Sequence, residues 1–151
     1  MLFSMIIFII DQVLKLIVGF TLDLNTSISV IKNFFYISNV HNYGAAFSIL
    51  YGNRLFLIVV SIFVLVCLYY FLLKNKKFRY IDIFIYSLLI GGILGNLFDR
   101  IIYGYVVDFL DFYIFNYNFP IFNLADICIV FSLFLIIIDT LRGGKVEVRS
   151  K

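Results

Sequence analysis

Two aspartates lie within strongly apolar segments of this chain and could together perform acid–base chemistry. Asp108 lies in VVDFLDF and Asp126 in FNLADICIVF, in a chain of 151 residues that is 64% hydrophobic. An ionisable side chain near hydrocarbon depth costs at least about 2.5 kcal/mol on insertion scales, so a functional site is the default hypothesis. When two carboxylates face each other, one can be ionised while its neighbour keeps a proton. A pair of this kind can activate a water molecule.

Asp126 also has a purely structural interpretation. Pro120 precedes Asn123, which is suited to be a helix N-cap, and Asp126 would then be the third residue of that helix. A carboxylate at this position accepts hydrogen bonds from free backbone N–H groups and complements the helix dipole. Capping and catalysis both stay open, because the same geometry would hold a catalytic carboxylate rigidly.

A third constellation combines glycines with polar residues. Gly91, Gly95 and Asp99 recur at intervals of four, with Asn96 and Arg100 beside them. A Gly-x-x-x-Gly pattern permits close helix approach within a bilayer, so helix packing alone would explain the glycines. The polar residues extend the same side of the helix, which leaves a functional role open.

Other kinds of catalytic site lack the residues they need. His41 is the only histidine, which argues against a Ser-His-Asp triad and against a zinc site of the usual ligand number. The chain has no HExxH, CxxC or GxxxxGK[ST] motif. Cys67 and Cys128 each lie alone in an apolar run and predict neither a disulfide nor a metal pair. Among the reactions considered, these residues leave open a carboxylate pair that activates water.

The composition is that of an integral membrane protein. Charged residues make up 14% of the chain, against about a quarter in soluble domains, and the apolar content far exceeds their roughly 45–50%. The length corresponds to one domain. The net charge of +3 comes largely from short basic segments, which are too small a basic surface for nucleic-acid binding.

Four segments are apolar enough to form transmembrane helices, and they cover about 1–20, 55–73, 81–98 and 122–138. The second is free of charge and its nineteen residues can cross roughly 30 Å of hydrocarbon. The first contains Asp11 and Lys15, which stand four apart on one helical face and can pair or face the protein interior. It lacks the basic n-region and A-x-A site of a cleaved signal peptide, so we expect a retained span.

The basic residues predict the orientation of these spans. Eight of the 12 Lys and Arg residues lie in the loop 74–80 and the tail 139–151, which four spans place on the same side. Because cytoplasmic segments carry the excess of Lys and Arg, this side and both termini are expected to be cytoplasmic. The segments 21–53 and 101–121 then face outward, with both candidate aspartates at the outer end of the bundle.

The outer segments are expected to form a small platform. Residues 26–40 partly alternate between polar and apolar and are rich in β-branched and aromatic types, which predicts short strands. Residues 108–119 are rich in aromatics, which are typical of the membrane–water boundary; a belt at this boundary and a platform that guides a substrate are both compatible with them. The predicted fold class is an all-α polytopic membrane protein, with residues 1–151 forming a single membrane domain of four transmembrane helices and a small extracytoplasmic β platform.

Four segments resemble, in order, the motifs of the lipoprotein signal peptidases (signal peptidase II), which are bacterial membrane aspartyl peptidases. DQVLK from Asp11 resembles the first-helix motif of this family, and NYGAAFS from Asn42 resembles its N-x-G-A-A-F box. GGILGNLFDRIIYGYVVDF from Gly91 resembles the G-N-x-x-D-R…G-x-V-x-D-F box, and FNLAD from Phe122 resembles the F-N-x-A-D box. The resemblance covers nearly the whole chain and agrees with the predicted topology.

The resemblance implies roles for individual residues. The catalytic pair would be Asp108 and Asp126. The site would be lined by Asn42, Asn96, Arg100 and Asn123, with Asp99 supporting Arg100 or the helix packing. Structural or site-adjacent positions would be held by Asp11 and Lys15. The backbone would be kept close to the substrate by Gly44, Ala45 and Ala46.

The implied activity is that of an intramembrane aspartic endopeptidase. It would remove the signal peptide from diacylglyceryl-modified prolipoproteins, cutting before the lipidated Cys. Its partners would be this lipid-modified prolipoprotein and membrane lipids, with no nucleic acid, no metal and no cofactor, and a monomer is sufficient for the chemistry. Its location would be the bacterial cytoplasmic (inner) membrane, with the active site toward the outer face.

Two other classes of function use similar residues. A small proton- or ion-coupled membrane transporter would also carry intramembrane Asp, Lys and Arg, although four spans without inverted repeats argue against it. A structural membrane subunit would use its polar residues only to pack helices.

Overall fold

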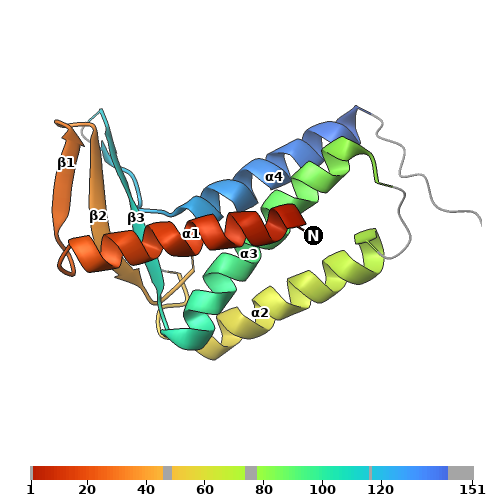
Figure 1. The fold of residues 1–151 in the computed structure, drawn as a ribbon, viewed down its shortest axis with the longest axis horizontal. Coiled ribbons are helices and arrows are strands. Elements are labelled where there is room, and N and C mark those ends of the chain that lie inside the picture. The colour runs from red at the N-terminus through yellow and green to blue at the C-terminus, as the bar shows by residue number, and fades with distance from the viewer. Residues whose placement is uncertain (1, 46–48, 74–77, 116, 143–151) are drawn as a thin grey trace, which may run out of the picture.

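A computed structural model describes residues 2–45, 49–73, 78–115 and 117–142. In these ranges the chain forms four α-helices, one π-helical segment and four strands. In chain order they are α1 (Leu2–Thr21), β1 (Ser27–Ile31), β2 (Phe35–Asn42), α2 (Arg54–Cys67), η2 (Leu68–Leu73), α3 (Tyr80–Ile102), β3 (Val106–Ile114), β4 (Tyr117–Asn118) and α4 (Leu124–Leu141). Figure 1 shows the strands gathered at one end of the helices, with the start of α3 and the end of α4 at the other end.

Three of the helices are long and apolar enough to cross a membrane, namely α1, α3 and α4. Helix α2 has 14 residues and continues directly into the six residues of η2. Together α2 and η2 cover the predicted span 55–73, and at about 1.5 Å of rise per residue they approach the roughly 30 Å of the hydrocarbon core. Helices are therefore present in all four predicted segments.

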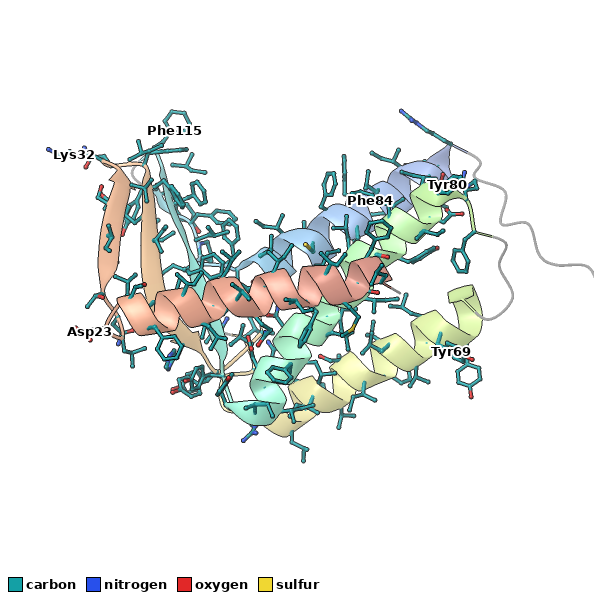
Figure 2. The ribbon with its side chains drawn as sticks, in the orientation of Figure 1. Asp23, Lys32, Tyr69, Tyr80, Phe84 and Phe115 are labelled. Atoms are coloured by element: carbon teal, nitrogen blue, oxygen red, sulfur yellow. The ribbon has the colours of Figure 1, made fainter. Side chains whose placement is uncertain are left out.

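The outer surface of the helices is apolar, as Figure 2 shows by the side chains that point away from the bundle. Phe84 is one of many large apolar side chains that are exposed on the helices. Tyr69 and Tyr80 lie at the end of the bundle away from the sheet, whereas Asp23 and Lys32 lie at the sheet end. An apolar band with tyrosines and charges at its two ends is typical of a membrane-embedded surface.

Helix α3 ends later than the sequence pattern predicted. It runs to Ile102, not to about residue 98, so Asp99 and Arg100 lie on its last turns. The backbone N–H groups of Tyr103 and Gly104 both donate to the Asp99 carbonyl oxygen, and Gly104 has a φ of 86°. A glycine in the left-handed region is a common way to end a helix. The turn delivers the chain directly into β3.

The strands form one antiparallel sheet in the order β1-β2-β3-β4. The strands predicted within 26–40 are confirmed by β1 and β2. The strand β3 was not predicted, because the aromatic residues of 108–119 suggested an interfacial belt. In the pairing of β2 with β3, Asn42 lies opposite Val106 and Val40 lies opposite Asp108. This register carries Asn42 to the neighbourhood of Asp108.

Helix α3 packs against α1 and α4, and three glycines bring their backbones close. A Cβ atom on Gly91 would lie 2.8 Å from the carbonyl oxygen of Ser4 in α1. On Gly95 it would lie 2.5 Å from Oδ2 of Asp11. On Gly92 it would lie 2.6 Å from the carbonyl oxygen of Ala125 in α4. The close helix approach predicted from Gly91 and Gly95 is confirmed.

We expect the substitution Gly92→Ala to destabilise the protein by about 1–3 kcal/mol, because a methyl group forced into a packed interface displaces its neighbours. Thermal unfolding in detergent would measure the loss. The matched control is Gly19→Ala in α1, where nothing lies within 4 Å of the added Cβ atom and the better helix propensity of alanine adds up to about 1 kcal/mol. Equal melting temperatures for the two variants would contradict the packing account.

Candidate active site

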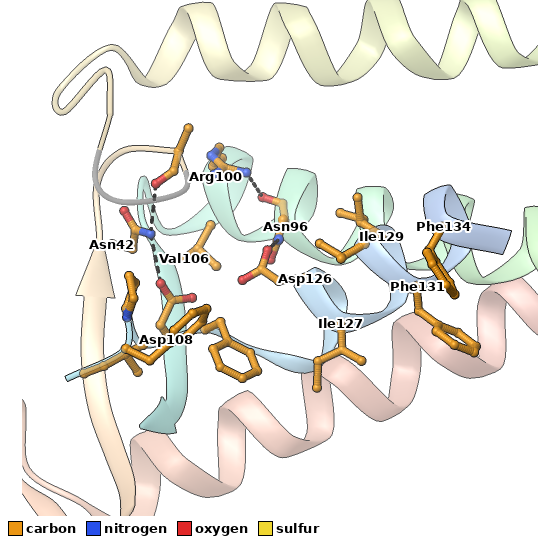
Figure 3. Close-up of a pocket in the computed structure, with 16 residues that line it drawn as sticks. Asn42, Asn96, Arg100, Val106, Asp108, Asp126, Ile127, Ile129, Phe131 and Phe134 are labelled. Carbon is orange, nitrogen blue, oxygen red and sulfur yellow. Dashed lines mark hydrogen bonds between the residues drawn. The ribbon is translucent and has the colours of Figure 1, made fainter. Parts of the chain in front are cut away.

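Asp108 and Asp126 line the same cavity, which lies where the sheet meets the helices and has a volume of about 720 Å³. Asp108 projects from β3, and Asp126 projects from the first turn of α4. Figure 3 shows Asn42, Asn96 and Arg100 around the two carboxylates. The fold thus brings together polar residues that lie far apart in the sequence.

Helix α4 begins with the cap that its sequence predicted. The backbone N–H of Asp126 donates to Oδ1 of Asn123 at 2.9 Å, and the backbone N–H of Asn123 donates to Oδ2 of Asp126 at 3.2 Å. This reciprocal pair is a capping box. The N-cap role of Asn123 and the third-position role of Asp126 are both confirmed, and the box holds the Asp126 carboxylate in one orientation.

Three asparagine amides donate to the two carboxylates. Asn123 Nδ2 lies 2.6 Å from Oδ1 of Asp108, and Asn42 Nδ2 lies 2.9 Å from Oδ2 of the same residue. Asn96 Nδ2 lies 2.8 Å from Oδ1 of Asp126. The capping box supplies the hydrogen bond to Oδ2 of Asp126. Each oxygen of both carboxylates therefore accepts at least one hydrogen bond from an N–H group. The pair is fixed from several sides before any substrate arrives.

The surroundings of Asp108 make it a poor place for a negative charge. Burial raises the pKa of the Asp108 carboxyl to about 7, and the neighbouring Asp126 charge raises it in the same direction. The hydrogen bonds from Asn42 and Asn123 oppose this rise. Near neutral pH the site can therefore hold one proton on its pair of carboxylates, as acid–base chemistry requires.

Arg100 connects α3 to the loop after β2. Its Nη2 donates to the carbonyl oxygen of Gly44 at 3.0 Å, and its Nη1 donates to the carbonyl oxygen of Asn96 at 3.2 Å. Ala45 lines the cavity beside it, while Ala46, predicted with Gly44 and Ala45, lies outside the described residues. A guanidinium has five N–H donors, so Arg100 has donors beyond these two for a group in the cavity.

A buried cluster lies next to the pair Asp108 and Asp126, which we call the dyad. The cluster consists of Asp11, Lys15 and Asp99. Lys15 Nζ lies 2.7 Å from Oδ2 of Asp11 and 2.7 Å from Oδ2 of Asp99. The predicted pairing of Asp11 with Lys15 is confirmed. Lys15 and Gln12 of α1 bind the Asp99 carboxylate, which packs α3 on α1, and the predicted support of Arg100 by Asp99 stays a prediction. Asp11 Oδ1 also accepts from the backbone N–H of Ala125 at 2.9 Å, which ties α1 to the start of α4.

Two further polar residues support the site and were missed in the sequence. Gln12 Nε2 donates to Oδ1 of Asp99 at 2.9 Å, and its position beside Asp11 in DQVLK is the signal that could have found it. Arg54 donates to the backbone carbonyl oxygens of Arg100 at 2.6 Å and of Ile101 at 2.8 Å. Arg54 thus satisfies carbonyls at the end of α3, a role that only the folded chain shows.

The remainder of the cavity is apolar and was not predicted. One wall is formed by apolar residues of α4, several of which Figure 3 labels along the helix, together with the segment before it. These residues are Phe119, Pro120, Ile121, Phe122, Ile127, Ile129, Val130, Phe131 and Phe134. The cavity therefore joins a polar end, which holds the dyad, to an apolar trench. Within the described residues, no group of three His, Cys, Asp or Glu side chains could hold a metal ion.

Comparison with known proteins identifies the family. The sequence profile described as signal peptidase (SPase) II, Peptidase A8, matches residues 3–142. Similar proteins include the lipoprotein signal peptidases of Staphylococcus aureus strains JH9 and Newman, each 41% identical over 141 residues that cover 93% of this chain and 86% of the relative.

Two solved structures share the fold, and both are described as a bacterial membrane enzyme determined by the in meso method. The first has a TM-score of 0.87 at 38% identity and covers 99% of this chain and 92% of that chain. The second has a TM-score of 0.80 at 40% identity and covers 93% of this chain and 90% of that chain. The profile, the relatives and these structures agree over nearly the full length, and the chain belongs to the signal peptidase II family.

Proposed function

We propose that this chain removes the signal peptide from diacylglyceryl-modified bacterial prolipoproteins, as an aspartic endopeptidase that cuts before the lipidated cysteine. The observation that carries the proposal is the buried pair Asp108 and Asp126 in one cavity, in a chain of the signal peptidase II family. The similar proteins named lipoprotein signal peptidase support this substrate class. The comparisons give no support to the alternative of an ion-coupled transporter.

In the proposed reaction the two carboxylates share the proton transfers. The ionised carboxylate takes a proton from a water molecule as the water oxygen bonds to the scissile carbonyl carbon. The protonated carboxylate donates toward the carbonyl oxygen, and a proton then passes to the leaving amine as the C–N bond breaks. Arg100, which lines the cavity, is well placed to orient a substrate carbonyl group. Neither a metal nor an organic cofactor is needed for these steps.

The apolar trench suits the remainder of such a substrate. The cavity is lined along α4 by apolar residues that continue away from Asp126, namely Ile127, Ile129, Val130, Phe131 and Phe134. A substrate that carries acyl chains and an apolar signal segment would bury apolar area there, at about 25 cal/mol per Å². The scissile bond would meanwhile lie at the polar end of the cavity.

The dyad gives the activity a defined pH dependence. Because burial and Asp126 raise the pKa of Asp108 to about 7, the pair loses its remaining proton as the pH rises through that value. We expect kcat/KM to fall about tenfold per pH unit above this point, since the general acid is then missing. Initial rates of cleavage between pH 5 and 9 would measure the profile. A rate that keeps rising through pH 9 would contradict it.

We also propose the arrangement in the membrane. Helices α1, α3 and α4, together with the segment formed by α2 and η2, would be four spans of the bacterial cytoplasmic (inner) membrane. The basic loop 74–80 and both termini would be cytoplasmic, and the sheet and dyad would lie toward the outer face. A monomer holds every residue of the proposed mechanism.

The orientation can be tested with single cysteines in a background that lacks Cys67 and Cys128. A membrane-impermeant thiol reagent added to intact cells is expected to label Lys32→Cys, at the tip of the sheet, and to leave Arg142→Cys, at the end of α4, unlabelled until the cells are lysed. The reverse pattern of labelling would overturn the proposed orientation.

Cleavage of a defined substrate tests the proposed function. The purified protein would be incubated with a diacylglyceryl-modified prolipoprotein and, in parallel, with the same prolipoprotein without its lipid. Mass spectrometry should find a product that begins at the modified cysteine, formed much faster from the lipidated substrate. Absence of this product, with proton or ion flux in liposomes that contain the protein, would favour the transporter.

A further inference from the structure

Besides its two carboxylate partners, the ammonium group of Lys15 contacts Asn96, whose amide binds Asp126. Lys15 is 4% exposed, and its Nζ binds Asp11 at 2.7 Å, Asp99 at 2.7 Å and Oδ1 of Asn96 at 2.9 Å. The contacts to Asp11 and Asp99 are ion pairs, and the contact to Asn96 is a hydrogen bond that Lys15 donates, because an ammonium has no acceptor. Two carboxylates already balance the charge of Lys15, and the third contact goes to a neutral amide that itself binds Asp126.

This contact determines which way the Asn96 amide points. Because Lys15 can only donate, Asn96 must present its oxygen to Lys15 and its NH₂ group to Asp126. The Asn96 Nδ2 to Asp126 Oδ1 distance of 2.8 Å is that of a good hydrogen bond. The amide dipole thus lies between a cation and a carboxylate and favours negative charge on Asp126.

The amides that bind Asp108 are fixed differently. The oxygen of Asn42 accepts from the backbone N–H of Gly44 at 2.9 Å, and the oxygen of Asn123 accepts from the backbone N–H of Asp126 at 2.9 Å. In the described part of the chain, both of these donors are neutral backbone groups. Asp126 additionally lies in the first turn of α4, where the helix dipole favours an anion.

We propose that Lys15 is a positioning residue that divides the roles within the dyad. Acting through Asn96, it keeps Asp126 as the ionised member that accepts a proton from water, and Asp108 as the member that holds the proton to be donated. The inference rests on the peptidase function proposed above and adds an assignment of the two roles. The charged groups that act on Asp126 are Lys15 from α1, Arg100 from α3 and Asp108 from β3, and the carboxylates of Asp11 and Asp99 pair with Lys15.

Two variants interrupt this path and leave the net charge of the cluster unchanged. Asn96→Ala removes the amide and leaves the ion pairs of Lys15 in place. The double variant Lys15→Gln with Asp99→Asn removes one positive and one negative charge, so the net charge of the cluster is unchanged, and the new amides can still donate hydrogen bonds. The matched control is Gln12→Leu, which removes hydrogen bonds to Asp99, Asp11 and the Gly95 carbonyl oxygen and leaves the bond from Lys15 to Asn96 in place.

The test is the pH profile of kcat/KM for cleavage of a lipid-modified prolipoprotein. In both variants the acidic limb, where the ionised carboxylate gains a proton, should move to higher pH by about one unit, with kcat/KM lowered about tenfold or more at the optimum. Gln12→Leu should lower the melting temperature and leave the acidic limb where it is in the unmutated protein.

A loss of activity in folded Asn96→Ala without movement of the acidic limb would overturn the inference. An equal movement in Gln12→Leu would also overturn it, because general loosening of the cluster would then explain the shift. If the double variant does not fold, Asn96→Ala still tests the step from Asn96 to Asp126, and an unmoved acidic limb there overturns the inference. Failure of the peptidase function itself would look different, since the unmutated protein would then leave the substrate uncut.

Discussion

Replacing either Asp108 or Asp126 with asparagine is expected to lower kcat/KM at least about 10³-fold, because each carboxylate takes part in proton transfers that contribute roughly 10²–10⁴ each. Asparagine has nearly the same shape but can neither take a proton from water nor hold one for donation. At position 126 its oxygen can still accept from the backbone N–H of Asn123, so the start of α4 should persist. At either position one of the two oxygen sites becomes an NH₂ group that faces an amide donor, Asn96 Nδ2 in the case of position 126, which costs about 1–3 kcal/mol.

Asp111 supplies the matched control for these variants. It lies on β3, the strand that carries Asp108, and it is 4% exposed. Its carboxylate accepts a hydrogen bond from the Ser38 hydroxyl at 2.9 Å. It does not line the cavity that holds the dyad. Asp111→Asn should therefore keep most of the activity. Melting temperatures of all three variants would separate loss of catalysis from loss of fold. A folded Asp108→Asn protein that cleaves as well as Asp111→Asn would contradict the assignment.

The substitution Lys15→Met is expected to destabilise the protein by about 3–5 kcal/mol, the usual cost when one partner of a buried ion pair is removed. Asp11 and Asp99 are 0% and 1% exposed, so neither carboxylate can recover its lost partner from water. Methionine fills the space of the lysine stem but supplies no donor to Asn96. The variant should unfold at a much lower temperature and, for that reason, is unsuitable for assigning roles within the dyad.

Lys32→Met is the control for this stability prediction. Lys32 is exposed between β1 and β2, and substitutions at such positions usually change stability by less than about 0.5 kcal/mol. Thermal or chemical unfolding in the same detergent would compare the two variants. Equal free energies of unfolding for Lys15→Met and Lys32→Met would contradict the prediction. Such a result would mean that Asp11 and Asp99 can lose the charge of Lys15 without cost.

Some of the structure follows from local physical rules and could be predicted. The helices follow from apolar segments near the length of a bilayer. The cap at Asn123 and Asp126 follows from residue types at fixed spacing, and the pairing of Asp11 with Lys15 follows from their separation of four on one helix. The prediction that Asp108 and Asp126 form a functional site follows from the cost of a charge in apolar surroundings.

Other parts depend on contacts that no local pattern encodes. The strand β3 was missed because Phe109 and Phe112 suit a sheet and a membrane interface equally well. The hydrogen bond between Asn42 and Asp108 depends on the register of β2 on β3, which is set by the whole sheet. The apolar trench along α4 was invisible because that helix is apolar on all sides, so its sequence could not distinguish the face toward the cavity from the face toward lipid.

The most direct test of the central claim is a cycle of cleavage rates for the unmutated protein, Asp108→Asn, Asp126→Asn and the variant that carries both substitutions. If the two carboxylates act as one unit, the double variant should be no slower than the slower single variant, because removal of either member already stops the chemistry. Losses that multiply in the double variant would show two independent contributions and would contradict a shared dyad.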